Sequence, residues 1–279
     1  YTETEKGITV KANGRTFVFS KKDGQLKDVS VNNRKISFAN GPRFIGARRA
    51  DRSLDQFYNH DDEKAKAKDR TYSEFTDAAV FTKLDVKEEG GNLILTANYK
   101  LGNLDKAQWT IHPDGMATLD YTYNFSGVVD LMGICFDYPE EQVLSKRWLG
   151  AGPYRVWQNR IHGTQYDIWE NDYNDPIPGE TFTYPEFKGY FGSVSWMSIR
   201  TKEGTISLTN ETPDSYIGVY QPRDGRDRLL YTLPESGISV LNVIPPVRNK
   251  VNSTDLCGPS SQPKWVDGSQ TGRLVIRFE

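Results

Sequence analysis

The segment WLGAGPYRVWQNRIHG, residues 148–163, concentrates aromatic rings, cations and flexible backbone within a short stretch of the chain. Its glycines and proline impose an irregular backbone that can pass close to another surface. From such a loop, the rings of Tyr154 and Trp157 could stack on apolar C–H surfaces of a ligand. The side chains beside them that can hydrogen-bond to hydroxyl groups are Arg155, Gln158, Asn159 and Arg160. We therefore expect a ledge that contacts a saccharide or a neighbouring domain, or else a structural loop whose rings plug the end of the fold.

Carboxylates dominate the next stretch, YDIWENDYNDPIPGETFTYPEFKGYFG, residues 166–192. A pair of carboxylates at a suitable separation can hydrolyse a glycosidic bond, but nothing in this spacing sets two of them at that separation. The acid–base pair that we select as a catalytic candidate is His162 with Glu186, which could epimerise or mutarotate a sugar.

Metal and cofactor motifs are missing from the sequence. The stretch DYNDP, residues 172–176, lacks the glycine and the terminal glutamate of a loop that wraps calcium. The chain has no nucleophile elbow, phosphate-binding loop, dinucleotide fingerprint or zinc motif. We therefore predict no cofactor, no metal ligand and no catalytic activity of the chain alone. His112, just before a hairpin turn, is predicted to be structural.

A long polar segment, PPVRNKVNSTDLCGPSSQPKWVDG, residues 245–268, lies between two late strands. Loops of this length without secondary structure tend to be functional or disordered. From this segment Asn252, Asp255 and Trp265 could reach a ligand. The alternative is a plain surface excursion that its prolines pin in place.

Alternation of apolar and polar residues over most of the chain predicts the strands that must position these side chains. Turn signals at residues 23–24, 114–115 and 203–204 each separate two such stretches and predict hairpins. We expect about a dozen short strands. Residues 61–70 carry helix formers without an apolar stripe, which indicates a solvated loop. The economical fold is one large antiparallel β-sandwich.

Composition bounds the partners. The 279 residues are 37% hydrophobic and 26% charged with a net charge of −2, which gives no electrostatic case for nucleic acid or an anionic membrane. No apolar run approaches the roughly 20 residues that span a bilayer. The start, YTETEKGITV, lacks a signal-peptide pattern and indicates an interior cut point or a processed end. Cys135 and Cys257 match no metal spacing, and we expect two free, buried thiols rather than a disulfide.

The block that begins at Trp148 resembles a known family. RWLGAGPYRVWQNR is similar to the W-x-G-x-G-P-x-x-x-aromatic-x-x-R segment in the C-terminal, small-chain domain of family 2 β-galactosidases. The matching residues are Trp148, Gly150, Gly152, Pro153, Trp157 and Arg160. Downstream, Pro185, Glu186 and Trp196 look like the family's Pro-Glu-Gly segment and the strand after it. Upstream, FVFSKKDGQLKDVSVNNRKI is similar to the family's opening hairpin, so the resemblance runs over most of the chain.

The resemblance implies a galactose-mutarotase-like supersandwich with a sugar-related role. In that family the catalytic glutamates lie in a separate barrel domain, and the terminal domain lends one late-loop Trp to the active site. This chain has Cys257 near that Trp position, with Trp265 further on. It also carries RADRSLD, residues 49–55, where the family has Ala-Pro-x-Asp-Asn-Asp. Both departures count against β-galactosidase specificity.

We therefore predict that residues 1–279 form a single all-β domain that is the C-terminal part of a larger glycoside hydrolase. It would bind saccharide or complete the active site of a catalytic barrel in the same or a partner chain. The predicted substrate-binding residues are Trp148, Tyr154, Arg155, Trp157, Arg160, Glu186 and Trp265. The alternatives are a stand-alone sugar enzyme (mutarotase, epimerase or lyase) and a purely structural module that docks a barrel. A polymer-degrading role would place the chain outside the cytoplasm.

Overall fold

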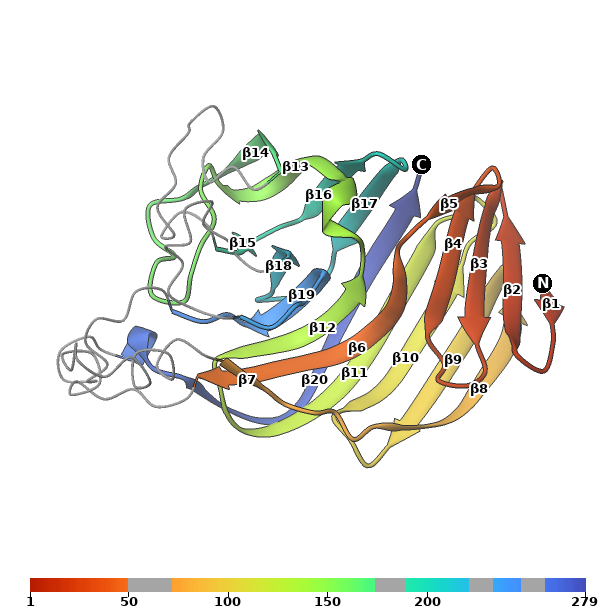
Figure 1. Cartoon of the computed structure of the whole chain (residues 1–279), viewed down its shortest axis with the longest axis horizontal. Coiled ribbons are helices and arrows are strands. Elements are labelled where there is room, and N and C mark those ends of the chain that lie inside the picture. Colours follow the sequence, from red (N-terminus) through yellow and green to blue (C-terminus); the bar gives the residue numbers. More distant parts are fainter. Residues whose placement is uncertain (50–71, 174–188, 221–232, 247–258) are drawn as a thin grey trace.

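Two antiparallel sheets pack face to face in the computed structural model (Figure 1). The structure describes residues 1–49, 72–173, 189–220, 233–246 and 259–279. Within these ranges helical structure is limited to two 3-10 turns, Glu140–Gln142 and Pro259–Ser261, and no helix is long and apolar enough to cross a membrane. The predicted large antiparallel β-sandwich is confirmed. Residues 61–70, predicted as a solvated loop, lie outside the described residues.

One sheet has eleven strands in the order β1-β2-β3-β4-β6-β12-β19-β18-β15, with β5 paired to β4 and β7 paired to β6. Its strands are Thr2–Glu3 (β1), Gly7–Ala12 (β2), Arg15–Ser20 (β3), Leu26–Val31 (β4), Arg34–Ile36 (β5), Ala39–Arg49 (β6), Tyr72–Glu74 (β7), Leu131–Asp137 (β12), Phe191–Gly192 (β15), Tyr216–Val219 (β18) and Ile238–Val243 (β19).

The other sheet has nine strands in the order β14-β13-β16-β17-β20-β11-β10-β9-β8. Its strands are Val80–Glu89 (β8), Asn92–Lys100 (β9), Leu104–Ile111 (β10), Ala117–Val129 (β11), Val143–Gly152 (β13), Gln165–Asp172 (β14), Trp196–Thr201 (β16), Thr205–Asn210 (β17) and Lys264–Phe278 (β20). The described residues thus hold more strands than the dozen predicted, partly because β1, β5, β7 and β15 are too short to show alternation.

The three predicted hairpins are present as β3–β4, β10–β11 and β16–β17. Gly24 and Gly115 sit in their turns with φ of +72° and +86°, a left-handed backbone that only glycine adopts at little cost. The Gly115 N–H donates to the His112 carbonyl at 2.9 Å and closes its turn. The register then follows from the turn, which puts the apolar residues of both strands on one face.

A large apolar core fills the space between the sheets. Aromatic rings meet there: on the side of the eleven-stranded sheet Phe38 stacks on Phe136 with ring centroids 4.7 Å apart, and across the two sheets Phe19 lies 5.8 Å from Trp109. All four rings are at most 1% exposed. Burial of each ring contributes roughly 1.5–3 kcal/mol to stability, so this core holds the two sheets together.

A second apolar cluster lies on the outer face of the eleven-stranded sheet. Gly133 is the register partner of both Ile45 and Leu241, so these three residues share one face. Their neighbours along the strands point into the core, which makes this face the outer one. We call the following residues the outer cluster: Ile45, Ala47, Tyr72, Leu131, Cys135, Val156, Trp157, Tyr190, Leu233, Leu241 and Ile244. The strands β6, β12 and β19 are therefore buried on both faces.

The tip of the β16–β17 hairpin ties the sheets together. Glu203 accepts hydrogen bonds from the Ser37 N–H at 2.8 Å, the Ser37 hydroxyl at 2.7 Å and the Tyr138 hydroxyl at 2.9 Å. Ser37 lies between β5 and β6, and Tyr138 follows β12. One carboxylate of the nine-stranded sheet thus satisfies three donors of the other sheet.

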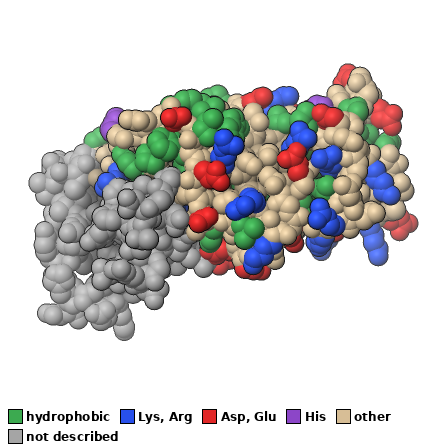
Figure 2. All heavy atoms as spheres, turned by 90° about the horizontal axis from the view of Figure 1, so that it is seen from above, with side chains coloured by type: hydrophobic (Ala, Val, Ile, Leu, Met, Phe, Trp, Pro, Cys, Tyr) green, Lys and Arg blue, Asp and Glu red, His purple; other side chains and the backbone are tan. Residues whose placement is uncertain are grey.

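β14 is the outermost strand of the nine-stranded sheet among the described residues. Its Tyr166 and Ile168 are 59% and 48% exposed. Figure 2, which looks down on this side of the molecule, shows hydrophobic side chains gathered beside the grey atoms. The Ile168 N–H donates to the Asp167 carboxylate at 2.7 Å, so a side chain rather than a neighbouring strand satisfies it.

Candidate functional site

The loop after β13 crosses from one sheet to the other. The run EEQVLSKRWLG, residues 140–150, predicts a strand that ends at Trp148. This predicted end is wrong, because β13 continues to Gly152 and its residues pair with β14 up to that point. Beyond the strand, Val156 and Tyr190 exchange two backbone hydrogen bonds of 2.7 and 2.8 Å, just before β15. The loop is thereby fixed to the edge of the eleven-stranded sheet and lies over its outer cluster.

Trp148 and Trp157 are both buried, at 0% exposure. The Trp148 ring lies edge-on to Phe191 at 4.8 Å, and its indole N–H donates to the Ala151 carbonyl at 3.0 Å. The Trp157 ring lies edge-on to Tyr190 at 5.8 Å within the outer cluster. In this conformation both rings anchor the loop and neither presents a face to solvent.

The remaining side chains of the loop differ in exposure. Arg155 is 4% exposed, and its guanidinium lies 5.7 Å from the centre of the Phe191 ring. That distance is within the range of a cation–π contact. Tyr154 and Arg160 are half-buried, and His162 is exposed. These last three are the predicted site residues of the loop that a ligand or a neighbouring domain can reach.

Gln158 fastens the loop to distant parts of the chain. Its backbone N–H donates to the Pro245 carbonyl at 3.0 Å. Its side-chain amide donates to the carbonyls of Ser260 at 2.8 Å and Gln262 at 2.6 Å. The residue is 7% exposed, and its side-chain oxygen is buried without a hydrogen-bond partner. Gln158 thus holds both flanks of the late segment instead of facing outward to bind a hydroxyl group.

Sequence reasoning missed this clamp because both acceptors of the side chain are backbone carbonyls more than 100 residues away. Every residue has a backbone carbonyl, so the residue types do not show which carbonyl accepts such a hydrogen bond. The residue types of the loop and the family-like spacing around Trp157 both pointed to this loop, but neither distinguished anchoring residues from accessible ones.

The other predicted residues are dispersed. Trp265 is 70% exposed and pairs with Val128 on the outer face of the nine-stranded sheet. Trp265 thus lies on the outer face of the nine-stranded sheet, whereas the buried Trp157 packs in the outer cluster of the eleven-stranded sheet. Glu186, Asn252, Asp255 and Cys257 lie outside the described residues. The His162–Glu186 pair therefore stays a prediction.

Cys135 is a free thiol in the outer cluster. Burial raises the pKa of this thiol to about 11, although the adjacent Arg43 acts in the opposite direction. The thiol is thus protonated at neutral pH and is a poor nucleophile. In the described ranges no group of three or more His, Cys, Asp and Glu side chains is arranged to hold a metal ion.

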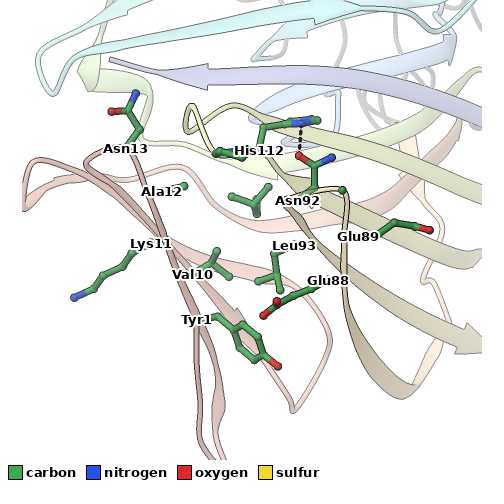
Figure 3. Close-up of a pocket in the computed structure, with 14 residues that line it drawn as sticks. Tyr1, Val10, Lys11, Ala12, Asn13, Glu88, Glu89, Asn92, Leu93 and His112 are labelled. Carbon is green, nitrogen blue, oxygen red and sulfur yellow. Dashed lines mark hydrogen bonds between the residues drawn. The ribbon is translucent and has the colours of Figure 1, made fainter.

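His112 lies at the other end of the molecule, in a cavity of about 570 Å³ between the β2, β8–β9 and β10–β11 segments (Figure 3). Its Nδ1 lies 3.2 Å from the Asn92 side-chain oxygen, and its Nε2 lies 2.8 Å from the Thr118 hydroxyl. Both ring nitrogens are thus engaged by neighbouring strands. This agrees with the structural role predicted for His112.

The chain is similar to known proteins both in sequence and in fold. The family model described as β-galactosidase small chain matches residues 11–242. No curated protein matches the sequence. Among solved structures, a galactose 1-epimerase from Lactobacillus acidophilus NCFM is similar over 100% of this chain and 97% of its own length, with 9% identity and a TM-score of 0.50.

Two further structures are similar at lower scores. An α-N-acetylgalactosaminidase from Bifidobacterium bifidum matches over 98% of this chain and 36% of its own, with 11% identity and a TM-score of 0.46. A galactose mutarotase-like protein from Lactobacillus casei ATCC 334 matches over 98% of this chain and 100% of its own, with 10% identity and a TM-score of 0.45. At 9% identity, the likeness to the epimerase shows a shared galactose-mutarotase-like fold and nothing finer.

Proposed function

The chain belongs to the β-galactosidase small-chain family, and on this premise we propose that it is the carbohydrate-associated sandwich of a family 2-like glycoside hydrolase. In this role it binds saccharide or completes the active site of a separate catalytic barrel, in the same or a partner chain. The barrel supplies the catalytic carboxylates, and this domain supplies side chains that contact and orient the sugar.

The observation that carries the proposal is the Gln158 clamp. Its three hydrogen bonds, to carbonyls of residues 245, 260 and 262, join the family-like loop to both flanks of the late segment. Family 2 enzymes carry an active-site aromatic residue in their late loop. A rigid attachment between the two loops would hold any group at this end in a fixed position, which active sites need.

We assign the roles by exposure. Buried Trp148 and Trp157 fix the loop, and Arg155 supports it by packing over the Phe191 ring. Half-buried Tyr154 and Arg160 contact the sugar, the first by stacking and the second by donating hydrogen bonds to hydroxyl groups. Glu186 and Trp265 stay candidates for the same role.

The test is a titration of the whole chain with galactose and lactose, followed by calorimetry. Replacing Arg160 by Met removes the donors and keeps most of the stem. We expect affinity for the sugar to fall roughly tenfold, as for the loss of a charge-assisted hydrogen bond. The matched control is Arg200→Met on the exposed face of β16. Equal affinity of both variants and the parent would remove the loop from the site.

A stand-alone epimerase or mutarotase is the competing function, since the similar epimerase structure has nearly the same length as this chain. Polarimetry of freshly dissolved α-galactose separates the two functions. The proposed role requires that the chain leave the rate of anomer interconversion unchanged. An acceleration that is lost on His162→Ala would establish the enzyme instead.

A further inference from the structure

The outer face of the nine-stranded sheet is polar along β10 and β11, but an apolar patch lies on it where β14, β13 and β16 run side by side. Trp196 points outward because β16 buries the alternate residues in the core. Register extends this face, since Trp196 is the partner of Leu149 and Leu149 is the partner of Ile168. Two positions further along β13, Ala151 is the partner of Tyr166. We call these five residues the platform.

The platform is open to solvent. Tyr166 and Ile168 are 59% and 48% exposed, and Leu149, Ala151 and Trp196 are half-buried. Figure 2 shows hydrophobic side chains gathered on this side of the molecule. Apolar residues exposed singly are ordinary on a protein surface, whereas a contiguous group of them indicates a binding surface.

A hydrogen bond fixes the ring of Tyr166 on the sheet. The Tyr166 hydroxyl lies 2.6 Å from the Ser195 hydroxyl. Ser195 lies on the far side of β13 from Tyr166, beside β16, and its backbone N–H donates to the Leu149 carbonyl at 2.9 Å. The Tyr166 side chain therefore reaches across β13 near Ala151, whose small methyl group leaves room for it. The ring thus lies along the sheet surface and, at 59% exposure, stays accessible. Preorganisation of this kind lowers the entropic cost of binding.

Hydrogen-bonding side chains border the platform on the same face. Arg147, at the next outward position of β13, is the partner of both Glu170 and Ser198. Thr209 of β17 is the partner of Trp196. Arg147 and Glu170 carry opposite charges, so these four side chains offer donors and acceptors without a net charge. Aromatic rings flanked by such groups match a sugar, which presents apolar C–H faces surrounded by hydroxyl groups.

The size of the platform favours a sugar chain over a protein partner. A stable protein interface uses about 20–30 residues on each side, and the platform has five. From β14 to β16 it measures about 10 Å, which is two strand spacings and accommodates two linked sugar rings. The Tyr166 ring above β13 and the Trp196 ring on β16 offer one stacking surface to each of them.

We propose that the platform binds a neutral oligosaccharide chain, whose adjacent sugar rings stack on Tyr166 and Trp196 while the bordering side chains hydrogen-bond to their hydroxyl groups. The class of ligand rests on the proposed function, but the site uses none of residues 153–163, which form the loop described above. The platform gives the domain a second sugar site, which retains a polymer rather than a single sugar.

The experiment titrates the intact chain with neutral tetramers to hexamers of galactose, glucose, mannose or xylose. Amide NMR shifts of β13, β14 and β16 report binding at the platform, and shifts of residues 154–160 report binding at the loop. We expect at least one of these oligosaccharides to shift the platform amides saturably. Tyr166→Ala should weaken this affinity roughly tenfold, as for the loss of one stacked ring. Tyr166→Phe keeps the ring, loses only the bond to Ser195, and should weaken the affinity about twofold.

The matched control is Tyr1→Ala. Tyr1 is 58% exposed, like Tyr166, but it lines the cavity beside His112 at the other end of the molecule. Both variants should fold, because each replaces an exposed ring, and Tyr1→Ala should bind the oligosaccharide as the parent does. The inference is overturned if no oligosaccharide shifts the platform amides, or if Tyr166→Ala binds as tightly as the parent.

A protein occupant gives a different result. If the platform amides shift with the concentration of the chain in the absence of sugar, and Tyr166→Ala abolishes this shift, a second copy of the chain occupies the platform and the inference is likewise overturned. None of these outcomes changes the test of the loop, which depends on Arg160→Met and on the amides of residues 154–160. The two proposals therefore stand or fall separately.

Discussion

The outer faces of the two sheets differ in polarity and in burial. On the nine-stranded sheet, the strands β9 and β10 alternate between buried and half-exposed residues, and the outer face is polar. On the eleven-stranded sheet, β12 is buried along almost its whole length, because the loop with Trp157 covers its outer face. A strand that is apolar on both sides indicates a third layer above the sheet. Here that layer is the loop that resembles the family motif.

Removal of the Trp157 ring, at the centre of the third layer, has the largest expected effect on stability. Trp157 is fully buried in the outer cluster. We expect Trp157→Ala to lower the free energy of unfolding by about 3–5 kcal/mol. Trp265→Ala, on the open face at 70% exposure, should change it by less than about 0.5 kcal/mol. Urea unfolding measures both, and similar losses in the two variants would erase the distinction between the faces.

Alkaline pH probes the same covered layer through Cys135. The pKa of its thiol is raised from 9.0 to about 11, mainly by burial. The unfolded chain loses this proton first, so the stabilisation is complete below about pH 9 and is lost as the pH rises toward 11. The loss amounts to about 3 kcal/mol at most. The difference in urea midpoint between the parent and Cys135→Ala should therefore shrink from about pH 8 to about pH 10.5, and a constant difference would refute the burial of the thiol.

Crowding at Gly133 should have a slightly smaller effect. A Cβ there would lie 2.1 Å from the Val240 carbonyl oxygen, within the ladder between β12 and β19. Overpacking of this kind costs about 1–3 kcal/mol, and we expect Gly133→Ala to lose about 2 kcal/mol. Thr122→Ala, on the open face, serves as the comparison and should melt within a degree or two of the parent. A Gly133→Ala variant as stable as Thr122→Ala would contradict the prediction, because it would show that β12 accommodates an added methyl group although both of its faces are covered.

The smallest expected effect on stability comes from the hydrogen bonds that link the two sheets. Glu203 accepts three hydrogen bonds from Ser37 and Tyr138 of the other sheet. We expect Glu203→Gln to cost about 1 kcal/mol, because the amide keeps one acceptor and loses the charge. Circular dichroism and tryptophan fluorescence should still report a single unfolding transition. Two separate transitions would mean that the sheets, and hence their faces, are not one cooperative unit.

Local signals predicted the hairpins and not the covering layer. Asp23-Gly24, Asp114-Gly115 and Glu203-Gly204 mark turns through residue type alone, and alternation beside them sets the register. The burial of Trp157 depends on contacts with Tyr190 and the outer cluster, which come from distant parts of the sequence. A ring that stacks on a ligand and a ring that plugs a sheet have the same sequence signature.

The same reasoning explains the mixed outcome at the candidate site. Gly152 was assigned to an irregular loop, yet it is the last residue of β13, where a Cβ would lie 2.4 Å from the Trp169 ring. Glycine there serves close packing of a strand rather than flexibility. Tyr154 and Arg160 are half-buried in the loop, and their role in binding a sugar stays a prediction.

The bond between the Ile168 N–H and the Asp167 carboxylate acts at the margin of the nine-stranded sheet. A strand from another molecule that added itself there would have to break this bond and strip water from Asp167, Glu170 and Asp172. An edge strand whose pairing with another chain is unfavourable in this way resists edge-to-edge aggregation. Among the described residues, this bond therefore disfavours the addition of a strand at β14, where Tyr166 and Ile168 are exposed.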